Sequence, residues 1–584
     1  MRRAVAILLA ILLLLPTSAQ AEWAMFGKDA NHTGVAEVTD RTIQKRTPVV
    51  SWDRGSSSEE VYSWGTSIGN FTANIGGDPY DRDVLHIVYV TARENDDGNL
   101  EGYLIIRDGG SPGRLMWEYA LGEVEDQEGN DLTSDFNDFQ AAYGTPAIAD
   151  FDDNGLMDIA VATPNGIVHF FEPDITYYSQ NEEYNEQDNG EKWSYETDLT
   201  IVRSNPSITS FNGGNDLVIS GIDLDPEKIN VIAVDGANGD ELWKFIADGT
   251  EISSPAVLVD GNSKVFVSVY DGGNLEVYAI QGGSAISGWT PKTIGSIVDP
   301  DDTRQHPLLP SIVIADITDD PGKEILVPQP PATYDGDAQL WLYTPDGSYA
   351  NGWGSGGGYE LGGGGDIDAT PVVGDIDDDG DLEIVAVTWS DTSTTSEITH
   401  VWAIGNDKTL EWETEYDTSN GGLGDDDEHA ISSPILAVIY TEDGKNNLDV
   451  FTCTTPKCFA LDGNDGHDGG DGRDQLWDID LKNRDANNVV FTSPAASDVD
   501  GDGLIDFVIV KDFLRWKVPF FLLKIAKGKA HLSKYIRIIQ TDKMIIKSHE
   551  KRIHLDGEPT ATDTTLEIKI VPKSLKILLP NGKK

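Results

Sequence analysis

Acidic side chains at alternate positions recur in four short stretches of the chain. In Ala369–Val387, ATPVVGDIDDDGDLEIVAV, three aspartates alternate, and a glycine and a glutamate follow them. Similar stretches run from 145 to 162 and from 493 to 510, and a degenerate one runs from 309 to 327. Oxygen donors with this spacing can converge on one cation, because the glycine lets the loop turn sharply around it.

These loops offer the oxygen ligands that calcium prefers. Calcium takes roughly 6 to 8 oxygens, so each loop would add a main-chain carbonyl and waters to its side chains. Without a cation, the gathered carboxylates would repel one another. The sequence therefore predicts Ca²⁺ sites that clamp the turn between two strands. The predicted ligands are Asp150, Asp152, Asn154 and Asp158; Asp375, Asp377, Asp379 and Glu383; Asp498, Asp500, Asp502 and Asp506; and, in the degenerate loop, Asp316, Thr318, Asp320 and Glu324.

The acidic loops belong to a longer repeat. A proline opens each repeat unit and a tryptophan ends it. Each unit contains about four short strands, often joined by turns rich in Gly and Asp. Four-stranded units at this period are typical of propeller blades, because one small sheet must stack on its neighbours to bury its faces. We therefore expect an all-β fold, a β-propeller of seven to eight four-stranded blades whose tryptophans fill the contacts between blades. The prolines that open the units are Pro146, Pro206, Pro255, Pro310, Pro371, Pro434 and Pro494, and the tryptophans that end them are Trp117, Trp193, Trp243, Trp289, Trp353, Trp412 and Trp477.

Two family resemblances rest on these repeats. The acidic loops resemble the FG-GAP or VCBS repeats of integrin-like propellers. The run AVDGANGDELW, Ala233–Trp243, resembles the A-x-D-x-x-x-G-x-x-x-W signature of propellers related to pyrroloquinoline-quinone enzymes. Together they cover about residues 23–510. The resemblance implies the propeller fold. It does not single out one function, because such repeats occur in adhesins, scaffolds, lyases and dehydrogenases alike.

No catalytic residues stand out. Quinoprotein dehydrogenases often stack an adjacent-cysteine disulfide on the cofactor, and this chain has no Cys-Cys pair. A glycosidase needs two paired carboxylates, and among 100 acidic residues no pair is distinguished. The sequence therefore favours a non-catalytic binding or scaffold module. A quinoprotein-like oxidoreductase and a carbohydrate-active enzyme on the same scaffold are the alternatives.

Composition restricts the partners. The formal net charge of -58 argues against nucleic acid, whose phosphates are bound by Lys and Arg. We expect a monomer that presents its loops to a protein or glycan ligand.

The first 21 residues are typical of a secretory signal peptide, with Arg2 and Arg3 before a short apolar run and a small-residue cleavage site. The mature chain would then start near Glu22 and be secreted or held at the cell surface. No later segment reaches the roughly 20 apolar residues that a membrane helix needs. Cys453 and Cys458 could form a local disulfide or stay as two thiols.

The last segment, residues 511–584, has a different composition. It holds 17 Lys and Arg against 7 Asp and Glu, in contrast to the acidic propeller region at 22–510. From about 502 to 580, including Asp556-Gly557-Glu558, it resembles the C-terminal end of diacylglycerol or lipid kinases, although the nucleotide-binding half has no counterpart upstream. We expect a short β-rich (α+β) tail, present either as a natural fusion or as an artificial join of two genes. A lipid-kinase fragment is thus a further alternative, as is a cationic segment that docks on a membrane or on the propeller.

Overall fold

The computed structural model describes residues 21–23, 32, 59–61, 65–71, 85–94, 100–109, 115–123, 144–173, 190–197, 199, 205–224, 227–259, 261–297, 309–333, 336–354, 357–363, 365–393, 396–417, 432–439, 448–454, 457–464, 476–480, 493–497, 506–508, 543–547, 552–555, 558–561 and 565–569. Within these ranges every regular element is a β-strand. The same residues contain no helix long and apolar enough to cross a membrane. The chain forms two compact units, Met1–Leu514 and Arg515–Lys584.

The described part of the first unit forms eight antiparallel sheets, which we number blade 1 to blade 8 in chain order. Blade 1 holds β1 (Ala21–Trp23), β2 (Glu59–Val61), β3 (Ser67–Gly69), β4 (His86–Glu94), β5 (Leu100–Asp108) and β6 (Leu115–Glu123). Blade 2 holds β7 (Ala147–Ala149), β8 (Asp158–Ala162), β9 (Ile167–Phe171) and β10 (Glu191–Glu196). Blade 3 holds β11 (Ser207–Thr209), β12 (Asp216–Leu224), β13 (Glu227–Asp235) and β14 (Glu241–Asp248). Blade 4 holds β15 (Glu251–Ile252), β16 (Ala256–Leu258), β17 (Lys264–Asp271), β18 (Asn274–Gln281), β19 (Ser284–Ala285) and β20 (Lys292–Ser296).

The later blades repeat the four-stranded pattern. Blade 5 holds β21 (Val313–Ala315), β22 (Glu324–Gln329), β23 (Ala338–Tyr343) and β24 (Tyr359–Leu361). Blade 6 holds β25 (Val372–Gly374), β26 (Glu383–Ser393), β27 (Ser396–Ile404) and β28 (Leu410–Asp417). Blade 7 holds β29 (Ile435–Ala437), β30 (Asp449–Thr454), β31 (Lys457–Leu461) and β32 (Trp477–Asp480), and blade 8 pairs β33 (Ala495–Ser497) with β34 (Asp506–Val508).

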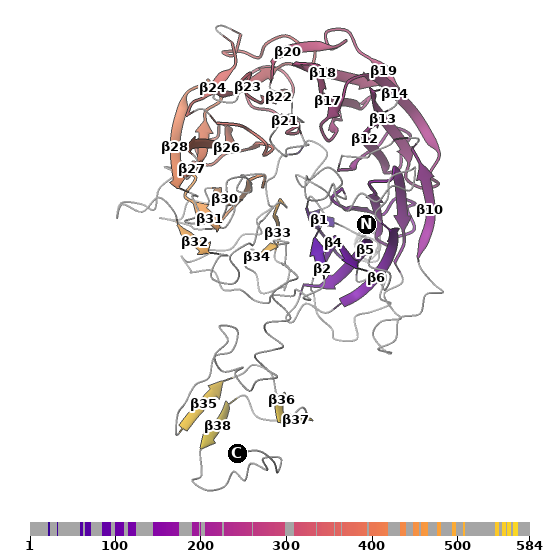
Figure 1. Ribbon diagram of the computed structural model, residues 1–584, viewed down its shortest axis with the longest axis vertical. Coiled ribbons are helices and arrows are strands. Elements are labelled where there is room, and N and C mark those ends of the chain that lie inside the picture. Colours follow the sequence, from indigo (N-terminus) through magenta and orange to yellow (C-terminus); the bar gives the residue numbers. More distant parts are fainter. Residues whose placement is uncertain are drawn as a thin grey trace, which may run out of the picture. The chain divides into compact units, whose positions relative to one another are not determined.

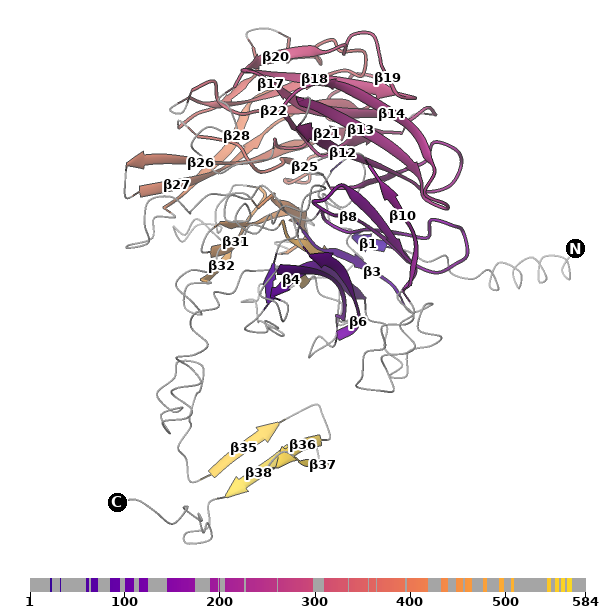
Figure 2. The same cartoon turned by 45° about the vertical axis from the view of Figure 1, so that its right-hand side comes forward.

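The blades are arranged around a common axis, with their short first strands toward the centre (Figure 1 and, turned, Figure 2). The ring closes between its two ends. Blade 8 contacts the first strands of blades 1 and 7, and a parallel bridge joins Gly65 to Ser493. This confirms the predicted all-β propeller, with seven sheets of four or more strands and an eighth that has two strands among the described residues.

Seven hydrophobic clusters hold the ring together, each spanning neighbouring blades. Phe266 of blade 4, for example, packs in one cluster with Ile314 and Tyr343 of blade 5. The cluster that closes the ring joins blades 7, 8 and 1. Strands such as β17 and β22 are buried over most of their length because both faces meet another blade, which explains their continuous apolar runs.

A set of hydrogen bonds links neighbouring blades, and most of these bonds use the residue before an opening proline. The backbone N–H of Asn205 donates to Ser254 Oγ at 3.0 Å, that of Thr370 to Ser433 Oγ at 3.0 Å, and that of Ser433 to Ser493 Oγ at 3.2 Å. An X-Pro step therefore marks the point where one blade is joined to the next.

The blade-end tryptophans whose side chains the structure describes fill the contacts between blades, as predicted; the Trp477 side chain lies outside the described residues. The indole N–H of Trp193 donates to a backbone carbonyl of the following blade at 3.2 Å, that of Trp289 at 3.1 Å, that of Trp353 at 3.0 Å and that of Trp412 at 2.7 Å. Trp243 has no hydrogen-bond partner for its indole nitrogen among the described residues.

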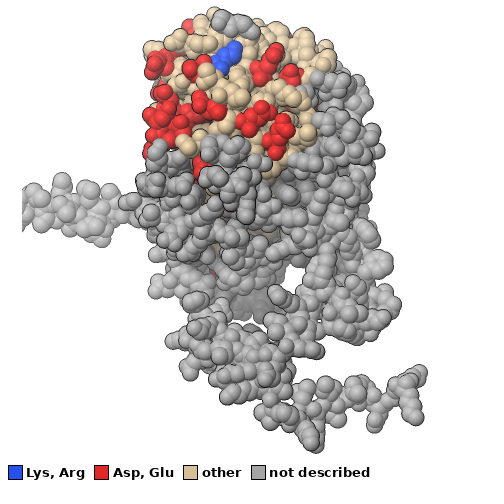
Figure 3. Space-filling model, turned by 90° about the vertical axis from the view of Figure 1, so that its left-hand side faces the viewer, with Lys and Arg blue, Asp and Glu red and all other residues tan. Residues whose placement is uncertain are grey.

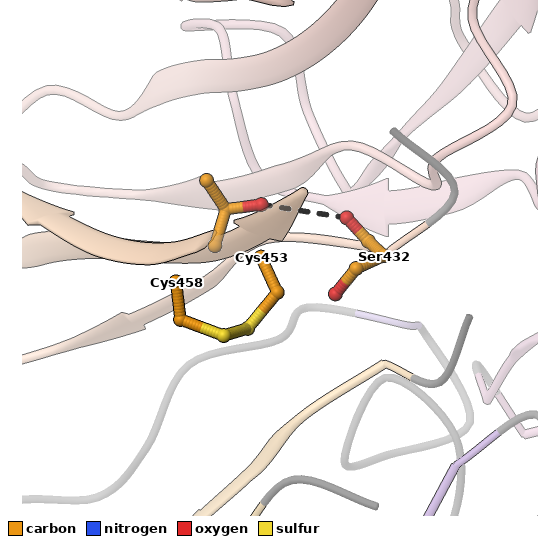
Figure 4. The surroundings of a disulfide bond; sticks show 4 residues. Ser432, Cys453 and Cys458 are labelled. Carbon is orange, nitrogen blue, oxygen red and sulfur yellow. Dashed lines mark hydrogen bonds between the residues drawn. A yellow bond between two sulfur atoms is a disulfide. The ribbon is translucent and has the colours of Figure 1, made fainter. Parts of the chain in front are cut away.

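The two cysteines form a disulfide across the hairpin of β30 and β31 (Figure 4). Cys453 and Cys458 face each other in the strand register and are both fully buried. Thr452, next to the disulfide, donates from its hydroxyl to the Ser432 carbonyl at 3.4 Å. The bond thus lies inside the cluster that closes the ring.

The second unit contains two strand pairs in its described part: β35 (Lys543–Lys547) with β38 (Thr565–Lys569), and β36 (Arg552–Leu555) with β37 (Glu558–Ala561). The β-rich character of the tail agrees with the sequence. Its described ranges hold strands alone, whereas a mixture with helix was expected.

Candidate metal centres

The acidic loop of blade 2 joins β7 to β8. The carboxylate of Asp150 accepts the backbone N–H of Asn154 at 3.0 Å and that of Gly155 at 2.9 Å. Asp152 accepts from the same Asn154 N–H at 3.2 Å. Asp153 and Gly155 adopt positive φ, at 58° and 87°, which reverses the chain around the carboxylates. The loop therefore wraps around its acidic groups.

Asp158 closes this loop from the first position of β8. It is fully buried, and its Oδ2 accepts the Phe151 N–H at 2.9 Å. Its Oδ1 has no hydrogen-bond partner among the described residues. One oxygen each of Asp150, Asp152 and Asp158 lie within 4.8 Å of one another. Burial and the nearby acidic groups raise the pKa of Asp158 to about 8, against the effect of the Phe151 hydrogen bond.

A fourth carboxylate reaches this loop from outside it. Glu172 directly follows β9 and contacts the side-chain amide of Asn154. It forms an ion pair with Lys192 at 2.7 Å and is among the charges that raise the pKa of Asp158. Sequence spacing does not identify this residue, because Glu172 meets the loop only through the pairing of β8 with β9.

The acidic loop of blade 6 has the same construction. Asp375 accepts the N–H of Asp379 at 3.2 Å and that of Gly380 at 3.1 Å. Glu383, the first residue of β26, accepts the Ile376 N–H at 2.9 Å. Oxygens of Asp375, Asp377 and Glu383 lie within 4.8 Å of one another. Burial, with the three nearby aspartates, raises the pKa of Glu383 to about 7.

The fifth residue of each acidic loop, Asn154 or Asp379, accepts a hydrogen bond from a backbone N–H of its own loop. The amide oxygen of Asn154 accepts the Leu156 N–H at 2.8 Å, and Asp379 Oδ1 accepts the Asp381 N–H at 2.9 Å. In each loop the structure thus brings three of the four predicted side chains close together, and the fourth lies beside them in a hydrogen bond to its own loop.

The degenerate loop of blade 5 is built differently. Glu324 is fully buried, accepts the Ile317 N–H at 2.6 Å and leaves Oε1 without a partner among the described residues. Burial raises its pKa. Asp320, however, accepts the backbone N–H of Asn351 at 2.7 Å, and Thr318 accepts the N–H of Asp320 at 3.3 Å. Within the described chain, this loop does not gather three carboxylates.

In the predicted loop at 498–506, Asp498, Asp500 and Asp502 lie outside the described residues, and Asp506 begins β34.

The carboxylate that begins the second strand recurs in blades without an alternating acidic loop. Asp216 of blade 3 accepts the Phe211 N–H at 2.7 Å, and Asp449 of blade 7 accepts the Ile439 N–H at 2.8 Å. Both are buried. This position therefore supports the turn in blades 2, 3, 5, 6 and 7, and the alternating aspartates before it distinguish blades 2 and 6. The spacing of alternating aspartates does not identify this acidic residue in blades 3 and 7.

The run that resembles quinone-enzyme propellers serves blade packing. Asp235 Oδ1 accepts the backbone N–H two residues later at 2.9 Å, which fixes the turn after β13. The Gly236 carbonyl accepts the indole N–H of Trp193. A Cβ at Gly239 would lie 2.7 Å from the Trp193 ring, so only glycine allows this approach. These contacts explain the motif without any cofactor.

The comparisons with known proteins concern the fold alone. No protein-family model and no curated protein matches the chain. Similar solved structures include the quinohemoprotein alcohol dehydrogenase from Comamonas testosteroni, with 10% identity, a TM-score of 0.44 and coverage of 83% of this chain and 76% of that one. The C-terminal domain of Pseudomonas aeruginosa PilY1 has 12% identity, a TM-score of 0.32 and coverage of 61% and 90%, respectively. The BBS1N protein in complex with ARL6DN has 9% identity, a TM-score of 0.33 and coverage of 64% and 94%.

Proposed function

We propose that this protein is an exported, calcium-binding β-propeller that acts as a binding or scaffold module and presents its loops to a protein or glycan. The observation that carries the proposal is Asp158 Oδ1, a fully buried carboxylate oxygen without a partner among the described residues, which lies beside two further carboxylates. A buried charge is stable only when it is paired or coordinates a metal. The chemistry of the donors selects the ion, since all are oxygens.

Each of the two acidic loops would hold its own calcium ion. Asp150, Asp152 and Asp158 would hold one ion in blade 2, and Asp375, Asp377 and Glu383 would hold another in blade 6. The ion supplies the positive charge that the gathered carboxylates lack. The backbone N–H groups of Phe151 and Ile376 keep the strand-initial carboxylates pointing into their loops. The ions therefore would fasten the first strand of each blade to the second.

The surface supports the choice of a polar partner. Acidic side chains gather in several places over the described part of the side shown in Figure 3, and the only basic area among them is a small blue spot. The formal net charge of -58 disfavours an anionic ligand such as nucleic acid. A neutral glycan or a basic protein surface fits these electrostatics best.

Calcium titration tests the proposal. Isothermal calorimetry on the chelator-treated full chain should show uptake of Ca²⁺, and Asp152→Asn and Asp377→Asn should each remove one class of site. The matched control is Asp216→Asn, which changes a strand-initial carboxylate in a blade without the acidic loop and should leave Ca²⁺ uptake unchanged. Absence of Ca²⁺ binding to the wild-type chain would overturn the proposal.

A further inference from the structure

A second group of possible metal ligands lies in blade 6, on strands rather than in an acidic loop. His400 on β27 faces Glu415 on β28 in the strand register, and Glu413 faces Trp402. Alternate residues of a strand point to the same side, so the four side chains share one face of the sheet. One donor atom each of His400, Glu413 and Glu415 lie within 4.8 Å of one another.

Packing fixes the direction of the imidazole. The His400 side chain is 4% exposed, and its ring stacks on Trp402 with centroids 5.7 Å apart. On the blade 5 side, Gly363 lies so close that a Cβ there would be 3.1 Å from Nε2. Nδ1 therefore stays directed at the carboxylates, 3.0 Å from Glu413 Oε1.

Blade 2 provides a natural comparison. His169 Nδ1 lies 3.0 Å from Glu191 Oε1, its ring stacks on Phe171, and Glu191 faces Phe171 just as Glu413 faces Trp402. The residue that faces His169 is Ser194, whereas the residue that faces His400 is Glu415. The histidine–glutamate pair thus occurs in both blades. Of the two, only blade 6 has a third possible ligand, Glu415.

We propose that His400, Glu413 and Glu415 bind a divalent transition-metal ion of the zinc type. One imidazole nitrogen and two carboxylates suit such ions, whereas calcium prefers oxygen donors throughout. Donors about 2.0–2.1 Å from a tetrahedral zinc ion lie roughly 3.3 Å apart, close to the present Nδ1 to Oε1 distance. Glu415 is exposed on β28, the outermost strand of blade 6 (Figure 1), so the ion can enter from solvent.

The ring proton limits the affinity. In the ion-free protein Nδ1–H can donate to Glu413, and the ion must displace this proton. The proton then resides on Nε2, which has no hydrogen-bond partner among the described residues. A buried N–H without an acceptor weakens binding. We therefore expect micromolar rather than nanomolar affinity, with three protein ligands and the remaining positions open to water or an external ligand.

Cobalt substitution provides the test, because Co²⁺ occupies zinc sites and absorbs visible light when bound. The full chain is first saturated with Ca²⁺, which fills the acidic loops, and then titrated with Co²⁺. We expect a visible absorption band that excess Zn²⁺ removes. Glu415→Gln, at an exposed position, should weaken Co²⁺ binding by roughly tenfold or more, and Glu415→Ser should reproduce the blade 2 arrangement and do the same.

Matched variants decide the outcome. His400→Gln should abolish the band, whereas His169→Gln in blade 2 should leave it unchanged. The proposal is wrong if the wild-type chain shows no such band, or if Glu415→Gln binds Co²⁺ as the wild type does. Because the acidic loops hold Ca²⁺ throughout and contain no histidine, failure of this site is distinguishable from failure of the calcium sites.

Discussion

The buried carboxylate of Asp158 predicts how stability depends on pH and calcium. Its pKa is about 8 in the folded, ion-free protein and 3.8 in a model peptide. The unfolded chain therefore releases this proton near pH 4, whereas the folded chain keeps it up to about pH 8. Between these values the folded state binds more protons, so the free energy of unfolding falls as the pH rises. The full loss is roughly 6 kcal/mol, at about 1.4 kcal/mol per pH unit over the interval between the two pKa values.

This loss is measurable as a shift in melting temperature. With an unfolding entropy of about 2 cal/mol/K per residue, a ring of this size has roughly 1 kcal/mol/K, so about 6 kcal/mol corresponds to about 6 °C. Scanning calorimetry in chelator should therefore show a melting temperature that falls between pH 5 and pH 8. Saturating Ca²⁺ should abolish the fall, because the bound ion stabilises the ionised carboxylate.

Asp158→Asn isolates the contribution of this loop. Its side-chain oxygen can still accept the Phe151 N–H, and its NH₂ group can donate to the neighbouring carboxylates. In chelator at pH 8 the melting temperature of the variant should be higher than that of the wild type. The variant should also lose the part of the Ca²⁺-dependent rise in melting temperature that comes from the blade 2 site. Glu383 makes the same pH-dependent contribution to the free energy of unfolding in both proteins, so this contribution cancels in the comparison. A variant that melts lower than the wild type under these conditions would refute the reasoning.

Three further predictions concern packing and the division of the chain. Trp412→Phe should lower the melting temperature more than Trp243→Phe, because only the first removes an interblade hydrogen bond that is present among the described residues; scanning calorimetry compares the two. Replacing Cys453 and Cys458 by alanine should cost about 2 kcal/mol, because the disulfide closes a short loop, and denaturant titration measures the change. Deleting Lys511–Lys584 should leave both Ca²⁺ uptake and the melting of the ring unchanged in calorimetry.

The sequence predicted the ring because each blade carries local marks. An X-Pro step begins a blade and a tryptophan ends it, and the structure shows that both mark contacts with the next blade. Ser433, for example, lies before Pro434 and accepts the N–H of Thr370 from the preceding blade. Local spacing also predicted that Asp150 and Asp152 lie close together, because both belong to one tight turn.

The remaining contacts depend on strand register, which spacing does not reveal. Glu172 meets the blade 2 loop only because β9 pairs with β8, and Glu415 meets His400 only because β27 pairs with β28. In the blade 5 loop, Asp320 likewise has a partner that spacing does not reveal, since it accepts a hydrogen bond from Asn351, a residue 31 positions away. Such partners can be identified only once the strands are aligned.

The recurrence of the strand-initial carboxylate shows how the metal sites relate to the fold. In blades 3 and 7 Asp216 and Asp449 support the turn through a backbone N–H and have no alternating acidic loop before them. Blades 2 and 6 use the same position for the same hydrogen bond and add aspartates beside the strand-initial carboxylate, where the proposed ion would bind. The turn is therefore complete as a structure before the ion binds. Because blades 3 and 7 keep this turn without the alternating aspartates, we expect that a blade can gain or lose an ion site through a few loop residues while the ring stays intact.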